Sequence, residues 1–217
     1  MNWDWSYVWA VFPSLVEGLK VTVLATAGGS AIAFSLGLLI AVGQRSPRLA
    51  ISLPLKGYVQ FVRGTPLLVQ LFFLYYVLPE YGVTLPATVV GVLALGLHYS
   101  TYASEVYRSG IESISRGQWE AALSLNLATQ TTWRTIVVPQ VFRAVLPALG
   151  NYVIDMFKAT PLLSAVTVME MVYEARTFGD NFYRYLEPFT ITGVLFLVIS
   201  LAAATVVRRL ERSLVRN

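Results

Sequence analysis

The sequence has no cysteine, one histidine and few charged residues, which make up 13% of the chain. Without cysteine there is no disulfide bond, thiolate nucleophile or thiolate metal ligand. The single His98 excludes the paired-histidine motifs of zinc sites, and the phosphate-binding pattern Gly-x-x-x-x-Gly-Lys-Ser/Thr does not occur. We therefore expect no metal centre, no catalytic residues and no ATP hydrolysis by this chain itself.

What is abundant is apolar sequence. The 217 residues are 56% hydrophobic, and the mean hydropathy is +0.61. A soluble domain or a disordered chain does not have this composition. The net charge of +4 is dispersed among the apolar stretches rather than gathered on one face, which argues against a nucleic-acid partner. The composition indicates a bundle of membrane helices.

Five stretches are long enough to cross a hydrocarbon layer of about 30 Å. These predicted spans are residues 15–44, 57–79, 81–107, 141–169 and 188–207. We predict an all-α membrane protein with five transmembrane helices, in which residues 1–217 form a single transmembrane domain.

The orientation follows from the distribution of lysine and arginine. Most of these residues lie in 45–63, 108–143 and 208–216, which alternate crossings place on one side of the membrane. The excess of positive charge marks the cytoplasmic side. We therefore expect the N-terminus outside, the C-terminus in the cytoplasm, and Trp3 and Trp5 in the outer aromatic belt.

Residues 112–140 are too polar to lie in hydrocarbon, so they must project from the membrane. We predict a short helix at 117–125, with Trp119, Ala122 and Leu123 on one face. Asn126 is expected to end it, because asparagine enters the left-handed region more readily than most residues. A second helical piece begins at Thr129 and is expected to end at Pro139.

This segment resembles the EAA motif of bacterial ABC-importer permeases. The resemblance rests on Glu120-Ala121-Ala122, the turn residue Asn126 (usually glycine in the family), Ile136 and Pro139. Four flanking motifs are similar to the polar-amino-acid uptake branch: Arg63-Gly-Thr-Pro-Leu-Leu-Val-Gln70, Tyr107-Arg-Ser-Gly-Ile-Glu112, Gly117-Gln-Trp-Glu120 and Leu146-Pro-Ala-Leu-Gly-Asn151. The similarity covers residues 14–212, and the chain is also similar to permeases of ectoine and hydroxyectoine uptake systems.

The resemblance implies a location in the bacterial inner membrane and a set of partners. These are a dimer of ATP-binding subunits that holds ATP and magnesium, an extracytoplasmic solute-binding protein, and a second permease copy or a sister permease. The cytoplasmic helix pair between spans 3 and 4 would dock on the ATPase. The residues implied in this contact are Gly117, Glu120, Ala121, Ala122, Asn126 and Pro139.

The fourth span carries charges inside an apolar stretch. Asp155 and Lys158 share one helical face, and Asn151 and Tyr152 lie one turn away. Charges at membrane depth face a polar path or each other, so this pair either lines a substrate path or fixes helix packing. An aromatic face beside one carboxylate suits a zwitterion or a delocalised cation.

His98 and Tyr99 in the third span are further candidates for the path. A lone histidine at such a position is more often a helix-packing residue than a ligand.

The chain is thus expected to be the membrane-spanning subunit of an ATP-driven importer for a polar amino acid or a related compatible solute. The alternative is a self-sufficient secondary transporter or channel, against which stands the lack of an inverted repeat. A membrane-embedded enzyme would need a catalytic constellation that one histidine does not supply. An exporter is disfavoured because the EAA pattern resembles importers.

The sequence also makes predictions for the segments that connect the spans. Pro54 is expected to break an interfacial elbow at 49–62, and Arg63-Gly-Thr-Pro66 to form a turn with Arg63 anchored at the membrane interface. A kink is expected at Thr160 and Pro161. Residues 172–187 are expected to be an outer loop, which could contact the solute-binding protein or be merely solvated.

Overall fold

The computed structural model describes residues 3–215, and these are helical with short connections and contain no strand. The predicted all-α class is confirmed. The α-helices are α1 (Trp5–Gln44), α2 (Leu49–Gly64), α3 (Leu67–Phe72), α4 (Ala87–Glu112), α5 (Arg116–Ser124), α6 (Thr129–Thr131), α7 (Val138–Ala159), α8 (Met171–Phe182) and α9 (Leu186–Val215). A π-helical turn at Phe73–Val77 and a 3₁₀ turn at Leu78–Tyr81 extend α3. A π-helical turn at Thr132–Val137 precedes α7, and a 3₁₀ segment at Thr160–Val166 follows it.

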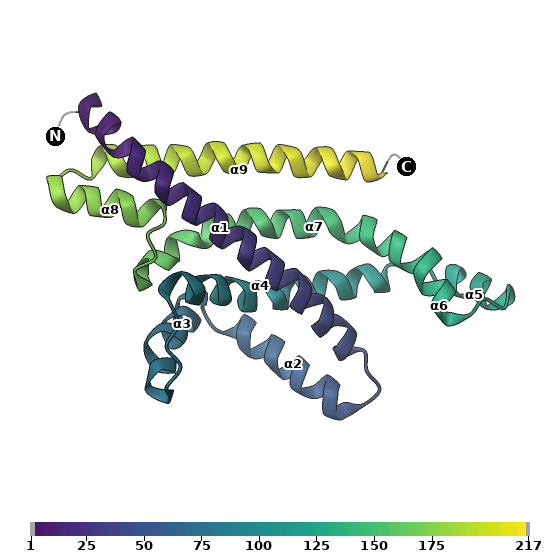
Figure 1. The fold of residues 1–217 in the computed structure, drawn as a ribbon. Helices are drawn as coiled ribbons and strands as arrows, with labels where there is room; N and C mark the ends of the chain where they lie inside the picture. The colour runs from purple at the N-terminus through teal and green to yellow at the C-terminus, as the bar shows by residue number, and fades with distance from the viewer. Residues whose placement is uncertain (1–2, 216–217) are drawn as a thin grey trace.

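Helix α1 crosses the other helices diagonally (Figure 1) and packs closely on α4. Glycines make this approach possible, since a methyl group added at Gly29 would lie 3.0 Å from Leu95 Cβ and one at Gly28 would lie 3.0 Å from Val92 Cγ1. Small residues at helix contacts are typical of membrane bundles, where packing rather than the hydrophobic effect holds the helices together. The helix begins at Trp5, well before the predicted span, and Asp4 caps it by accepting a hydrogen bond from Ser6 N.

Helices α2 and α3 meet at a bend of 105°. Thr65 is extended because it precedes Pro66, which disfavours the helical conformation in the residue before it. The expectation that Pro54 breaks this region is wrong, because Pro54 lies inside α2. The predicted turn at residues 63–66 is where the chain bends.

Three helical segments of the described chain are long and apolar enough to cross a membrane. They are Trp5–Gln44, Thr129–Val166 and Leu186–Ser213, and the bent pair Leu49–Arg63 and Leu67–Tyr81 would be a fourth if it forms one span. The predicted stretch 81–107 corresponds to α4, which starts later because Gly82 and Pro86 hold a non-helical connection. It is not among these segments, since its C-terminal half is polar from His98 onward.

The α-helical part of the fourth predicted span ends at Ala159 and continues as a 3₁₀ segment from Thr160, at the position expected for a kink. The predicted loop at 172–187 is wrong, because most of it forms α8. Glu170 caps this helix by accepting hydrogen bonds from Val172 N and Tyr173 N at 2.9 and 2.7 Å. Its Ala175 and Phe178 then pack on α1, a tertiary contact that local charge patterns do not reveal.

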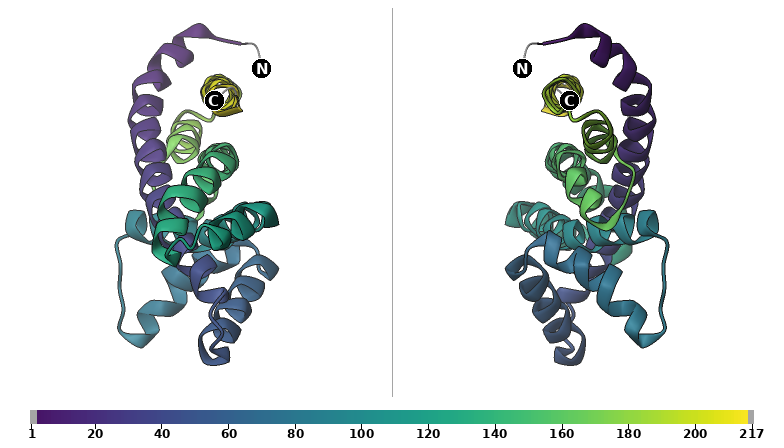
Figure 2. Two further views of the ribbon diagram at one scale, coloured as in Figure 1. Left: turned by 90° about the vertical axis from the view of Figure 1, so that its right-hand side faces the viewer. Right: turned by 90° about the vertical axis from the view of Figure 1, so that its left-hand side faces the viewer.

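The connections gather at the two ends of the bundle. The α1–α2 connection, the α5–α6 region and the C-terminal end of α9 lie at one end, whereas the start of α1 and the α8–α9 connection lie at the other (Figure 1). Figure 2 looks along the bundle, with α9 seen nearly end-on and α1 along one edge. At the N-terminal end, Asp4 N donates a hydrogen bond to Glu187 Oε1 at 3.0 Å, which ties α1 to α9.

Candidate functional site

The candidate functional site has two parts. The first is the coupling segment, residues 112–140, which projects from one end of the bundle (Figure 1). The second is the aromatic cluster, formed by His98, Tyr99 and Tyr102 of α4 and Tyr152 of α7. All four of its side chains are partly exposed.

Within the coupling segment, α5 ends as the sequence predicts. Asn126 is left-handed, with φ of 49°. Asn126 N donates to Leu123 O at 2.9 Å, and Leu127 N donates to Ala122 O at 3.0 Å. These two bonds satisfy carbonyl groups at the helix end that would otherwise lack partners. Asparagine therefore does here what glycine commonly does.

The predicted apolar face of α5 is only partly right. Ala122 is 3% exposed, and the ring of Trp119 meets that of Trp133 edge-on at 5.6 Å. Leu123, however, is 79% exposed and does not share this contact. One alanine and one indole suffice to hold the short α5 against the following turn, so Leu123 is left on the outer surface.

The remaining coupling residues lie on the outside. Gly117, Glu120 and Ala121 are exposed, and Glu120 pairs with Arg116 across one helical turn at 2.8 Å. An exposed pair of this kind contributes little to stability, so the carboxylate remains free to exchange partners. The prediction that Pro139 ends the second helical piece is wrong. Pro139 stands at the start of α7, directly after the wide turn Thr132–Val137, and the helix runs through it.

The rings of the aromatic cluster are in mutual contact. His98 lies 5.4 Å from both Tyr99 and Tyr102, measured between ring centroids. Tyr152 lies 6.2 Å from Tyr99 and 5.8 Å from Tyr102. Two helices thus bring together residues that are far apart in sequence, and the cluster unites His98, Tyr99 and Tyr152 as candidate path residues.

Gln70 connects the aromatic cluster to the bend between α2 and α3. Its Nε2 donates to Val62 O at 2.8 Å, to Thr65 O at 3.1 Å and to Thr65 Oγ1 at 2.8 Å. Its Oε1 lies 3.2 Å from His98 Nδ1. Gln70 is not among the path residues predicted from the sequence, although an amide inside the apolar run after Pro66 is an available signal.

Asp155 and Lys158 form an ion pair with 3.1 Å between Oδ1 and Nζ, and their side chains are 50% and 54% exposed. Asn151 is also exposed. Asp155 follows Tyr152 by three residues in α7, so its carboxylate lies on the same face of that helix as this member of the aromatic cluster. The structure is therefore compatible with both roles predicted for this pair. The two charges contact each other, as a packing role requires, and they also adjoin the candidate substrate path.

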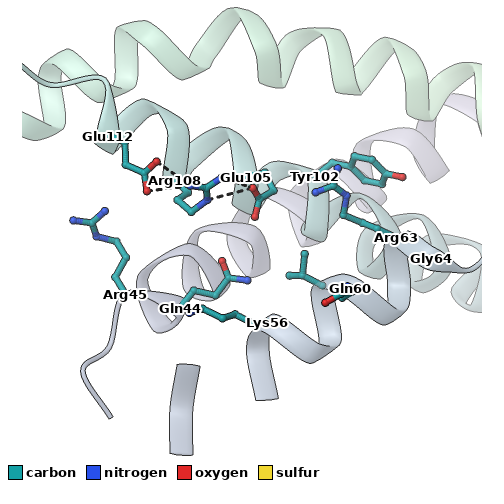
Figure 3. Close-up of a pocket in the computed structure, with 11 residues that line it drawn as sticks. Gln44, Arg45, Lys56, Gln60, Arg63, Gly64, Tyr102, Glu105, Arg108 and Glu112 are labelled. Carbon is teal, nitrogen blue, oxygen red and sulfur yellow. Dashed lines mark hydrogen bonds and ion pairs between the residues drawn. The ribbon is translucent and has the colours of Figure 1, made fainter. Parts of the chain in front are cut away.

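A cavity of about 850 Å³ opens between α2 and α4; we call it the inner cavity (Figure 3). The charged residues that line it are Arg45, Lys56, Arg63, Glu105, Arg108 and Glu112. The guanidinium of Arg63 lies over the Tyr102 ring, 5.0 Å from the centroid, and its anchoring at the membrane interface stays a prediction. Tyr102 is not among the residues predicted from the sequence, although it follows His98 by one helical turn.

The described residues contain no group of three or more acidic or histidine side chains that could hold a metal ion. Their arrangement suits binding and mechanical contact. It consists of an exposed helical hairpin at one end and a partly exposed aromatic and charged region on α4 and α7. Neither part brings together a nucleophile and a base.

Comparison with known proteins agrees with this arrangement. The family model described as binding-protein-dependent transport system inner membrane component matches residues 33–216. The chain is 41% identical to a probable amino-acid ABC transporter permease protein of Sinorhizobium fredii, over 98% of this chain and 92% of that protein. It is 34% identical to an L-cystine transport system permease protein of Bacillus subtilis, over 96% of this chain and 92% of that protein. A crystal structure of an amino acid ABC transporter with histidines superposes with a TM-score of 0.93 at 33% identity, covering 98% of this chain and 100% of that one.

Proposed function

We propose a docking surface, a topology and a substrate class for this chain from one premise, that it belongs to the family of binding-protein-dependent transport system inner membrane components. It is the membrane permease component of an amino-acid ABC importer, a multi-pass protein of the bacterial inner membrane. ATP is hydrolysed by a partner ATPase, so this chain is not an enzyme. Family membership also implies a solute-binding protein as a partner.

The docking surface is the outer side of the coupling segment. The observation that carries this proposal is its projection from the bundle with Gly117, Glu120 and Ala121 exposed. Small residues let another surface approach α5 closely, and the Glu120 carboxylate offers a charge-assisted hydrogen bond to a basic partner. Asn126 and Pro139 shape this surface rather than contact the partner directly.

Bulk added at Ala121 tests this docking surface. Ala121→Trp should abolish coupling, so that both solute uptake and solute-stimulated ATPase activity of the reconstituted importer fall at least tenfold, roughly the loss of 1.4 kcal/mol of contact energy. Ala202→Trp, on the exposed surface of α9, is the matched control and should leave both activities near wild type. Normal transport by Ala121→Trp would contradict the assignment. By contrast, Ala122→Trp should destabilise the hairpin itself, because Ala122 is buried.

The proposed topology is one permease domain, residues 1–217, with five crossings, the N-terminus outside and the C-terminus in the cytoplasm. Helix α4 supplies the fifth crossing, since its 26 residues reach about 39 Å at 1.5 Å per residue. Its polar inner half would face other helices rather than lipid. Because the chain has no cysteine, Ser46→Cys and Asp180→Cys can be labelled one at a time with an impermeant maleimide in whole cells. Only Asp180→Cys should react. Labelling of Ser46→Cys alone would show that the chain has the opposite orientation.

The exposed Asp155–Lys158 pair supports a second permease copy, or a sister permease, across a polar path. Charges that face lipid are costly, so this half-exposed pair requires a polar surface opposite it. We place the substrate path between the two copies, along His98, Tyr99, Asn151, Tyr152, Asp155 and Lys158. A self-sufficient transporter would instead move solute when the purified chain is reconstituted without the ATPase.

The proposed substrate is a polar amino acid or a related compatible zwitterion. Its cationic group would rest against tyrosine faces beside one carboxylate, an arrangement that favours ammonium and other compact cations. The names of the relatives reported above speak of amino acids and L-cystine, and ectoine remains a candidate on chemical grounds alone. The two substrate classes are distinguished by measuring uptake of labelled amino acids in the presence of excess ectoine. Competition by ectoine but by no amino acid would overturn the amino-acid proposal.

The outer partner surface is proposed to include α8. Arg176 and Asp180, on exposed positions of this helix, form a long ion pair of 3.8 Å. Such exposed pairs are weak and can exchange for contacts with a solute-binding protein.

A further inference from the structure

We propose that Arg63 binds the carboxylate of the transported amino acid, at the point where the aromatic cluster meets the inner cavity. This inference rests on the proposed function, because it takes the aromatic cluster to be part of the substrate path. It adds a residue from α2 that the predicted path did not contain. It also gives the substrate a direction, with the carboxylate toward the inner cavity.

The guanidinium of Arg63 contacts an aromatic ring but is not paired with a carboxylate in the described residues. It lies over the face of Tyr102 at 5.0 Å, and it makes no ion pair with any side chain in the described part of the structure. A cation–π contact with a ring does not use the N–H donors of the guanidinium as hydrogen bonds to side-chain oxygens would. These donors match the two oxygens of a carboxylate, which arginine binds in a bidentate manner. The position over the ring therefore leaves the donors of Arg63 available for a carboxylate.

The other cations around the inner cavity are less suited to this role. Arg108 is held by Glu105 at 2.7 Å and by Glu112 at 2.8 Å. Arg45 lies at the end of the cavity opposite Arg63 and Tyr102 (Figure 3). Arg63 is thus the cation that adjoins the aromatic cluster and is not neutralised by a nearby carboxylate.

The charge on the other side of the cluster is complementary. Arg63 lies over the Tyr102 ring, and that ring lies 5.8 Å from the ring of Tyr152. Asp155 follows Tyr152 by three residues in α7, so the two lie on one face of that helix. A positive group from α2 and a negative group from α7 therefore flank the same tyrosines. A zwitterion in this region is favoured with its carboxylate toward Arg63 and its amino group toward Asp155 and the tyrosine faces. An amine without a carboxylate would leave the positive charge of Arg63 without an ion-pair partner.

The experiment compares each amino acid with its own α-carboxamide. The full chain is purified in detergent with its ATPase subunits, and binding of the proteinogenic L-amino acids and their carboxamides is measured by isothermal titration calorimetry. The wild-type complex should bind the acid about tenfold more tightly than the carboxamide, the scale expected for hydrogen bonds to a charged group. Arg63→Gln should bring this ratio close to one while leaving carboxamide binding unchanged. Arg63→Lys should retain part of the preference, because lysine keeps the charge but not the planar fork.

Lys56→Gln is the matched control, since Lys56 lines the same cavity, and it should keep the wild-type ratio. Unchanged carboxamide binding by Arg63→Gln shows that the variant is folded. A wild-type ratio in Arg63→Gln would overturn the assignment of Arg63 while leaving the proposed substrate class intact. Failure of every amino acid to bind the wild-type complex would instead overturn the proposed substrate class, and the Arg63 assignment with it.

Discussion

The packing of α1 on α4 leads to a quantitative prediction for Gly37→Ala. A methyl group at Gly37 would lie 2.7 Å from Ala103 Cβ and 2.9 Å from Ser100 O. Neither neighbour can rotate away, because one is the first side-chain atom and the other belongs to the backbone. Normal contacts between such atoms are 3.4 Å or longer. The two helices must therefore move apart locally by several tenths of an ångström.

The cost of this separation outweighs the gain in helix propensity. Overpacking a tight contact costs about 1–3 kcal/mol, whereas replacing glycine by alanine in a helix gains up to about 1 kcal/mol. We expect Gly37→Ala to lower the free energy of unfolding by about 1–2 kcal/mol. The control is Gly193→Ala in α9, where a methyl group meets nothing within 4 Å. That variant should be as stable as the wild type or slightly more stable.

The measurement is the thermal unfolding midpoint of the purified chain in detergent, at matched detergent and protein concentrations. For a chain of this size, 1 kcal/mol corresponds to about 2–4 °C, so the two variants should differ clearly. Uptake by the reconstituted importer should fall with Gly37→Ala, because α4 carries most of the aromatic cluster. Equal midpoints for the two variants would refute the argument that glycine is needed for the α1–α4 approach.

Two further predictions concern the bend and the charged pair. Gln70→Leu removes the amide nitrogen that donates to Val62 O and to the oxygens of Thr65 at the bend, and it should lower the free energy of unfolding by about 1–3 kcal/mol by leaving polar groups unsatisfied. The control Gln60→Leu, at an exposed position of α2, should cost little, and equal thermal midpoints of the two variants would contradict the role of Gln70. Asp155→Asn should change stability by less than about 1 kcal/mol, because its pair with Lys158 is half-exposed, yet reduce uptake in proteoliposomes; unchanged uptake would favour a purely structural pair.

Local sequence rules predict those parts of the fold in which the chemistry is local. The helix α5 and its end at Asn126 follow from helix propensity and from asparagine's tolerance of the left-handed region. The bend at Thr65 follows from the restriction that Pro66 imposes on its predecessor. Pro54 shows the limit of such rules, because α2 continues through it although a proline beyond the first turn removes one backbone hydrogen bond. Residues 171–182 show another limit, since their helix depends on the burial of Ala175 and Phe178 against α1.

The candidate site likewise contains residues that local sequence patterns can identify and residues that they cannot. His98 and Tyr99 are adjacent in one span, and Asp155 and Lys158 are one turn apart, so the sequence is enough to propose them. The contact between Arg63 and Tyr102 joins two helices through a fold that no local pattern specifies. The same is true of Gln70, whose partners lie in α2, in the bend and in α4. Tertiary contacts of this kind require the structure.

The amide of Gln70 also links the movements of two parts of the site. Its nitrogen holds the corner between α2 and α3, and its oxygen touches His98. Any change in the angle at this corner therefore displaces His98 or breaks that contact. While that contact holds, a change in the angle between α2 and α3 is accompanied by a movement of His98 and of the rings that it touches. The bend and the aromatic cluster are thus linked through one side chain.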